Sequence, residues 1–168
     1  YLKSKKGNVR YTNVCFNKRD RMKYGDEIPD DVNVLEEVKE DGWIHGCFEG
    51  CTSLVTIDVP SSVNVIGVKC FKECVSLSSI TIPSTVSKIG DYCFQSCSSL
   101  SSISIPSSVS VIGSNCFNKC GLLMSVAVPL SISAIGDRCF NACASLKAIS
   151  IPFGVKIISD QCFSGCIS

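Results

Sequence analysis

The sequence predicts an α/β solenoid, a right-handed coil built from short tandem repeats, and three observations carry this prediction. Twelve of the thirteen cysteines form pairs whose members are four residues apart, and each pair begins 23 residues after the previous one. A phenylalanine follows the first cysteine of every pair, and five of the six prolines keep the same period. The first cysteines of the pairs are Cys47, Cys70, Cys93, Cys116, Cys139 and Cys162.

A strand is expected first in each repeat. A period of roughly 20 to 29 residues with regularly spaced leucine and isoleucine is typical of leucine-rich-repeat solenoids. The segment LSSITI, residues 77–82, has the form expected of a strand, with Ile80 and Ile82 directed to the core and the hydroxyl side chains directed to solvent. Pro83 ends this strand because it has no amide donor. We expect these strands to run in parallel along the concave face of a horseshoe.

A short helix or 3-10 turn is expected next, on the convex side. In a helix over YCFQSC, residues 92–97, the two cysteines and Phe94 lie on one side. Asp91 is a candidate N-cap for this helix, and Gly90 is expected to provide backbone angles that other residues avoid. Stacked repeats then bury one phenylalanine spine and two rows of cysteines.

Buried free thiols are the favoured interpretation of the cysteine pairs. The β-carbons of a helical i, i+4 pair tilt the same way, which disfavours a disulfide within the pair. Disulfides between repeats would distort a regular stack, and zinc needs ligands around one point, whereas these cysteines form rows. Disulfide and metal readings stay open as less favoured alternatives. Buried free thiols indicate either a reducing compartment or burial deep enough to resist oxidation, and we expect neither a metal nor a cofactor.

Composition and motifs argue against several classes of function. The formal net charge is +1 and no run of about 18 apolar residues occurs, so neither a nucleic-acid partner nor a membrane span is expected. The single histidine, His45, is not paired with a nucleophile, and no phosphate-binding or dinucleotide motif is present. We therefore expect a protein without catalytic residues that is not an enzyme.

The chain is predicted to divide into a charged amino-terminal cap, residues 1–46, and tandem repeats, residues 47–168. Nine of the 16 Lys and Arg residues and 10 of the 15 Asp and Glu residues lie in residues 1–50. A first degenerate repeat begins at Pro29 and contains an eight-residue insertion, in which Trp43 is a candidate anchor for a partner. Packing of Trp43 against the cap is an equally good alternative.

Two further segments of the cap have expected roles. The alternating segment 8–16 is expected to be a strand that covers the first repeat. The basic segment KRDRMK, residues 18–23, is interpreted as a solvated face because acidic residues are interspersed, in preference to a nuclear-import or phosphate-contacting patch.

The phrase IPSSVSVIGSNCFNKCGLL, residues 105–123, resembles the BspA-like leucine-rich repeats. In that family an alanine usually stands where this chain has the first cysteine of each pair, and cysteine there is similar to the branch expanded in parasitic amoebae. The resemblance implies a surface adhesin if the bacterial members are followed, whereas many protozoan members lack a signal peptide. Members of the amoebic branch usually carry an upstream helical region, so its absence here indicates a fragment.

The predicted function is a protein-protein interaction scaffold that acts inside the cell, in the cytoplasm or nucleus, on a protein partner that the sequence does not identify. The alternative is a cell-surface adhesion or antigenic module. A third expectation is self-association through the last repeat, which has no cap. The candidate partner-binding residues on the concave face and in the insertion are Trp43, Asp58, Ser79, Thr81, Ser102, Ser104, Met124, Ser125, Lys147 and Ser150.

Overall fold

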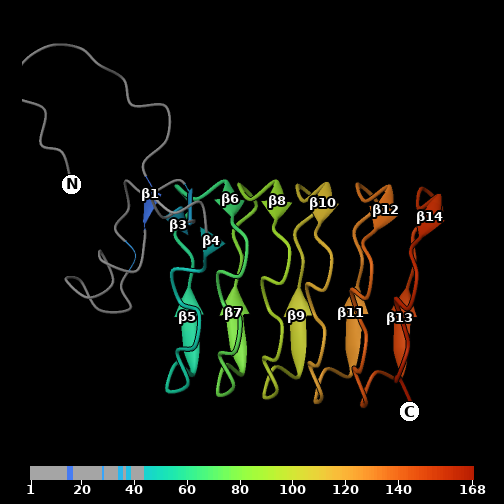
Figure 1. Cartoon of the computed structure of the whole chain (residues 1–168). Helices are drawn as coiled ribbons and strands as arrows, with labels where there is room; N and C mark the ends of the chain where they lie inside the picture. The colour runs from blue at the N-terminus through green and yellow to red at the C-terminus, as the bar shows by residue number, and fades with distance from the viewer. Residues whose placement is uncertain (1–14, 17–27, 29–33, 36, 39–43) are drawn as a thin grey trace, which may run out of the picture.

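The computed structural model describes residues 15, 16, 28, 34, 35, 37, 38 and 44–168. Over residues 44–168 the chain winds into coils that stack side by side, so that residues 23 apart in the sequence are neighbours (Figure 1). Each complete coil contributes one strand to each of two sets of parallel strands. The parallel solenoid expected from the 23-residue period is therefore confirmed, whereas its right-handed winding and horseshoe curvature stay predictions.

The first set consists of three-residue strands. They pair in register in two ladders. β5 pairs with β7, and β11 lies between β9 and β13 and pairs with both. The central residue of each strand is directed inward and its two neighbours outward, as the alternation of LSSITI predicts. These strands are β5 (Thr56–Asp58), β7 (Ser79–Thr81), β9 (Ser102–Ser104), β11 (Ser125–Ala127) and β13 (Ala148–Ser150).

The second set consists of two-residue strands that form one seven-stranded parallel sheet along the stack (Figure 1). These strands are β1 (Cys15–Phe16), β2 (Val34–Leu35), β6 (Val65–Ile66), β8 (Lys88–Ile89), β10 (Val111–Ile112), β12 (Ala134–Ile135) and β14 (Ile157–Ile158). Within the predicted insertion, β3 (Glu37–Val38) pairs antiparallel with β4 (Ile44–His45). Most of segment 8–16 and all of 18–23 lie outside the described residues.

The expected helix on the convex side is wrong, because residues 44–168 contain no helix and the fold in this range is all β. In each of the five turn segments from Lys69 onward, two residues have left-handed backbone angles, such as Tyr92 with φ 58° and Ser96 with φ 60°. A helix cannot continue through such residues. It follows that this part of the chain has no helix long enough to cross a membrane.

Hydrogen bonds between coils replace the helical ones in the turn segment. The amides of Tyr92, Phe94 and Ser96 donate at 2.8 Å to carbonyls of the next coil. Intervening amides close short turns within the coil, as when Cys97 donates to the carbonyl of Phe94 at 3.1 Å. The turn segment thus satisfies its backbone by stacking, as the strands do.

The predicted roles of Gly90 and Asp91 are also wrong. Neither Gly90 nor its equivalent Gly113 has a positive φ, but a Cβ on Gly113 would lie 2.4 Å from the amide nitrogen of Asp91 in the preceding coil. Glycine is needed there because two backbones approach closely. Asp91 caps no helix; its Oδ1 accepts a hydrogen bond of 2.8 Å from the amide of Ser114 in the next coil.

The predicted phenylalanine spine is confirmed and forms the centre of the core. Neighbouring rings are stacked with centroids 5.2 to 5.7 Å apart and planes within 13° of parallel. Burying each phenylalanine side chain contributes about 1.5 to 3 kcal/mol. The fully buried rings are Phe48, Phe71, Phe94, Phe117 and Phe140.

The cysteine rows lie beside this spine, and all twelve cysteines of residues 44–168 are free thiols, as predicted. The second cysteine of a pair donates its thiol to the carbonyl of the phenylalanine one coil earlier, as Cys97 does to Phe71 at 3.1 Å. The same hydrogen bond recurs in four other coils. In the first row, the Sγ atoms of Cys47 and Cys70 are 3.1 Å apart.

Burial favours the protonated form of the thiols whose pKa it raises. Desolvation raises the pKa of Cys97 and of Cys143 to about 12, against the lowering effect of hydrogen bonds with the backbone. Desolvation likewise raises the pKa of Cys70, Cys93 and Cys116. Because the thiolate is the nucleophilic and metal-binding form, these cysteines serve packing.

We expect Gly113→Ala to lower the free energy of unfolding by about 2 kcal/mol or more, because the added methyl overlaps backbone that cannot move aside without separating two coils. Gly121→Ala is the matched control, since a Cβ there meets nothing within 4 Å. Urea unfolding followed by circular dichroism measures both variants. Equal stabilities would show that the coils are not in close backbone contact.

Stability is expected to fall as the pH rises above about 8.5, the usual pKa of a cysteine in an unfolded chain. Above that pH the unfolded state releases thiol protons that the folded state retains, up to about pH 12 for Cys97. Each such thiol contributes a slope of up to about 1.4 kcal/mol per pH unit. Urea titrations between pH 8 and 10 measure the free energy of unfolding at each pH. This free energy should fall less steeply with pH for Cys97→Ala than for the parent chain. Identical slopes would contradict the burial of this thiol, because lysine and tyrosine titration is common to both proteins.

Candidate interaction surface

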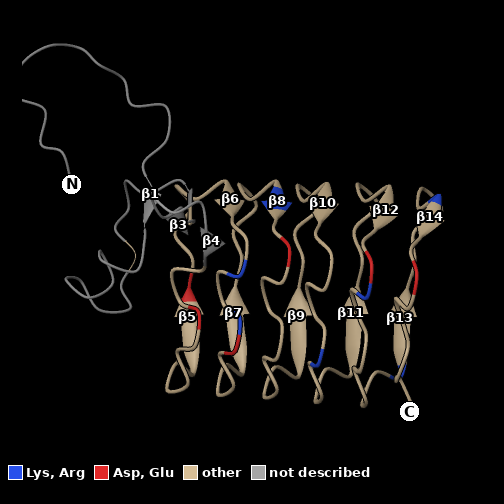
Figure 2. Cartoon of the chain, viewed as in Figure 1, with Lys and Arg blue, Asp and Glu red and all other residues tan. Residues whose placement is uncertain are grey.

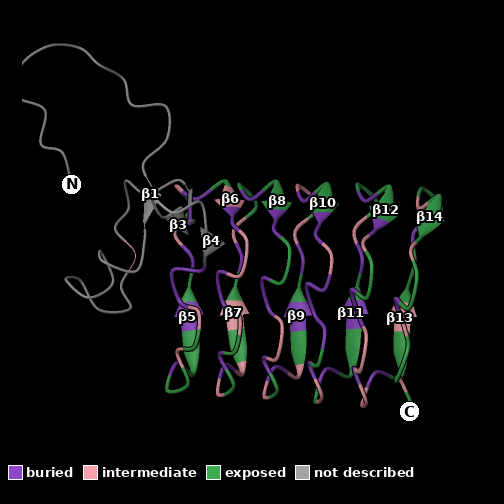
Figure 3. Ribbon diagram, viewed as in Figure 1, coloured by how far each residue is buried: buried purple, intermediate pink, exposed green. Residues whose placement is uncertain are grey.

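The outward side chains of the three-residue strands form one exposed surface, which we call the serine face (Figure 3). Because the strands pair in register about 4.8 Å apart, its side chains align in two rows across the coils. The first row is Thr56, Ser79, Ser102, Ser125 and Ala148, and the second row is Asp58, Thr81, Ser104, Ala127 and Ser150.

The structure places the predicted binding residues as follows. Seven of them lie exposed in the two rows of the serine face: Asp58, Ser79, Thr81, Ser102, Ser104, Ser125 and Ser150. Met124 and Lys147 are exposed directly before β11 and β13, and they are neighbours, since the amide of Lys147 donates to the carbonyl of Met124 at 3.0 Å. Trp43 lies outside the described residues.

The chemistry of the serine face is that of small hydroxyl groups. Its only ionisable side chain is Asp58, on β5 (Figure 2). Hydroxyl groups form hydrogen bonds but bury little apolar area, whereas the residues that dominate binding energy at interfaces are usually large. The rows therefore provide a regular polar surface without an anchor of their own.

Large exposed apolar side chains lie at the borders of this surface, and sequence reasoning missed three of them. Leu122 is 54% exposed, Leu130 is 84% exposed and Phe153 is fully exposed. Two of them are visible in the sequence as departures from the repeat. The position after the recurrent proline is serine in three repeats, but it is Leu130 and Phe153 in the last two. The repeat pattern identifies the residues that recur, and these two residues are exceptions to it.

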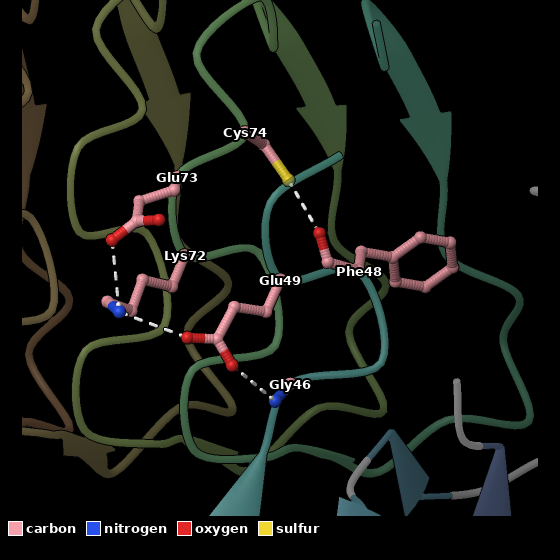
Figure 4. Close-up of polar contacts among 6 residues, drawn as sticks. All are labelled: Gly46, Phe48, Glu49, Lys72, Glu73 and Cys74. Carbon is pink, nitrogen blue, oxygen red and sulfur yellow. Dashed lines mark hydrogen bonds and ion pairs between the residues drawn. The ribbon is translucent and has the colours of Figure 1, made fainter. Parts of the chain in front are cut away.

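A charged cluster joins two coils on the turn segments (Figure 4). Lys72 lies 3.0 Å from Glu49 of the preceding coil and 3.0 Å from Glu73. Partial burial alone raises the pKa of Glu49, but the hydrogen bond and charge of Lys72, with the amide of Gly46, outweigh burial and lower it. Partial burial alone lowers the pKa of Lys72, and the two carboxylates outweigh that effect and raise it. The cluster is a link between coils, and pairs of this exposure contribute at most about 1 kcal/mol.

The described residues also bear on a metal site and on self-association. In the described part of the chain, no three His, Cys, Asp or Glu side chains gather as a metal site would require. In the last coil, Ile157, Ile158 and Ile167 are between 49% and 83% exposed. These side chains lie where the sequence predicts self-association, and that expectation stays a prediction.

Comparisons with known proteins agree with this architecture. The crystal structure of a leucine-rich repeat protein from T. pallidum superimposes with a TM-score of 0.71 at 32% identity, covering 78% of this chain and 74% of that one. A leucine-rich repeat protein from Bacteroides ovatus gives a TM-score of 0.54 at 30% identity, covering 79% of this chain and 43% of that one. A leucine rich cell surface protein from Faecalibacterium prausnitzii gives a TM-score of 0.54 at 30% identity, covering 82% of this chain and 44% of that one.

The chain therefore spans less than half the length of the last two relatives. No curated protein is detectably similar to it. Six copies of the BspA type leucine-rich repeat match residues 44–168, which includes every cysteine pair. With the 23-residue period, the stacked coils and the relative from T. pallidum, this match shows that the chain belongs to the family of BspA-type leucine-rich repeat proteins.

Proposed function

We propose that this chain is a non-enzymatic scaffold that binds a protein partner through the serine face and the residues along its borders. The observation that carries the proposal is the serine face itself, ten exposed side chains held in two rows on in-register strands. A solenoid presents such a surface over many coils, and repeat proteins of this construction commonly use it for binding. Ten of the twelve cysteines of residues 44–168 are buried in the core, where a substrate cannot reach their thiols.

The state of the cysteines supports a location in the cytoplasm or nucleus. Secreted proteins with many cysteines usually form disulfides, whereas the twelve cysteines of residues 44–168 are arranged as free thiols. Ten of these twelve are buried. Burial is compatible with an oxidising exterior as well, so location needs its own test.

The scaffold is tested by capturing partners, with chemical cross-linking, from lysate of the cells that produce the protein. Ser102→Arg with Ser104→Arg places two large charged groups on the serine face at β9, and we expect the captured partner to fall at least tenfold. Val111→Arg on β10 is the control, because this side chain is 46% exposed on the seven-stranded sheet instead. If the β9 variant has an unchanged melting curve and still captures the partner, the serine face is not the binding surface.

The second candidate is a cell-surface adhesion module, which one relative favours because it is described as a leucine rich cell surface protein. Antibody staining of intact cells against permeabilised cells separates the two functions. We expect signal only after permeabilisation. Staining of intact cells would move the protein to the surface and make adhesion the better function.

A further inference from the structure

We infer that the scaffold holds its partner by an apolar patch beside lysines on the coils of β11 and β13, and that the partner segment is a peptide rich in apolar and acidic residues. The inference rests on the proposed function and adds the class of partner and its anchor. The apolar patch consists of Leu122, Met124, Ala127, Leu130, Ala148 and Phe153.

Exposure of the patch is not required by the fold. At the position of Leu122 the other coils have Ser53, Ser76, Ser99 and Ser145, and they stack in the same way. At the position of Leu130 and Phe153 the earlier coils have serine. Large apolar side chains at solvent positions that serine fills elsewhere bring no packing advantage to the solenoid. A group of large exposed apolar side chains on adjacent coils is typical of an interaction site.

The residues of the patch are neighbours through the ladder between β11 and β13. Met124 lies beside Lys147, and Ser125 pairs with Ala148. Leu130 and Phe153 occupy equivalent positions of adjacent coils, as Ala127 and Ser150 do. The eight residue steps from Leu122 to Leu130 span roughly 26 Å at most, from a rise of about 3.3 Å per residue. A short peptide segment is long enough to contact both ends of the patch.

The charges around the patch are positive. Lys147 adjoins Met124, and Lys119 is exposed three residues before Leu122. Residues 92–168 contain only two acidic residues, Asp137 and Asp160, each shortly after a strand of the seven-stranded sheet, and β9, β11 and β13 carry none (Figure 2). Carboxylates of a ligand therefore meet lysines without competition on these strands, and basic groups are repelled.

The experiment uses the full chain and three labelled synthetic peptides of about 16 residues. The first has leucine and phenylalanine spaced three and four apart among glutamates, the second has lysine in place of glutamate, and the third has serine in place of the apolar residues. Fluorescence anisotropy is expected to show at least tenfold tighter binding of the first peptide than of either other one. The affinity should weaken as salt increases.

Variants assign the binding to the patch. Leu122→Ser with Met124→Ser, which gives this coil the residues of its neighbours Ser99 and Ser101, should weaken binding of the acidic peptide at least tenfold. Val55→Ser is the matched control, because Val55 is 54% exposed at the position equivalent to Met124 and should have no effect. Lys147→Glu should weaken binding of the glutamate peptide and strengthen that of the lysine peptide. Melting curves verify that each variant is folded.

Three results would overturn the inference. The first is equal binding of the glutamate and lysine peptides, or binding that survives the Leu122 and Met124 substitutions. The second is binding to vesicles of phosphatidylserine and phosphatidylcholine in place of the peptides, which would assign the patch to lipid. The third is a mass above 18.0 kDa in sedimentation that these substitutions abolish, without peptide binding, which would assign the patch to a second copy.

Failure of the inference is distinguishable from failure of the scaffold function. Partner capture that survives Leu122→Ser with Met124→Ser, but is lost with the arginines on β9, would leave the serine face as the binding site and remove only the anchor. Capture that survives both pairs of substitutions would reject both proposals.

Discussion

Backbone hydrogen bonding between successive coils is the interaction on which the rest of this structure depends. The short strands and the turn segment donate to the neighbouring coil, so the 23-residue period must be kept in register at several points of each coil. Because the coils are in register, equivalent side chains of successive coils align in rows. The register also explains the close approach at Gly90 and Gly113, where two backbones meet with no room for a Cβ.

The interior rows follow from this constraint. A phenylalanine in every coil gives stacked rings at nearly constant spacing, and the adjacent cysteines are small enough to lie beside them. The thiol also donates a hydrogen bond to a phenylalanine carbonyl of the previous coil, which an alanine cannot do. Cysteine thus combines small volume, apolar character and a weak donor at a single interior position. The same residues recur inside every coil because each coil packs against the equivalent residues of its neighbours.

The outward positions of the strands are free to vary because their side chains are directed to solvent and not into the shared core. On most coils these outward positions are serine or threonine, whose hydroxyl groups are solvated. The coils of β11 and β13 also expose Leu122, Leu130 and Phe153, together with lysines. Function in a repeat protein is therefore to be sought where equivalent positions differ, since the repeated residues serve the fold.

The sequence by itself determined the solenoid, its period, the inward isoleucines of the strands, the phenylalanine spine and the free thiols, because each is a regularity that a local pattern records. It did not determine the structure of YCFQSC, residues 92–97. An i, i+4 cysteine pair has helical spacing, yet left-handed angles at Tyr92 and Ser96 direct alternate amides to the next coil, and only the stacked structure provides those acceptors. The apolar patch likewise needed the tertiary structure, because Met124 and Lys147 become neighbours only when coils 23 residues apart in sequence lie side by side.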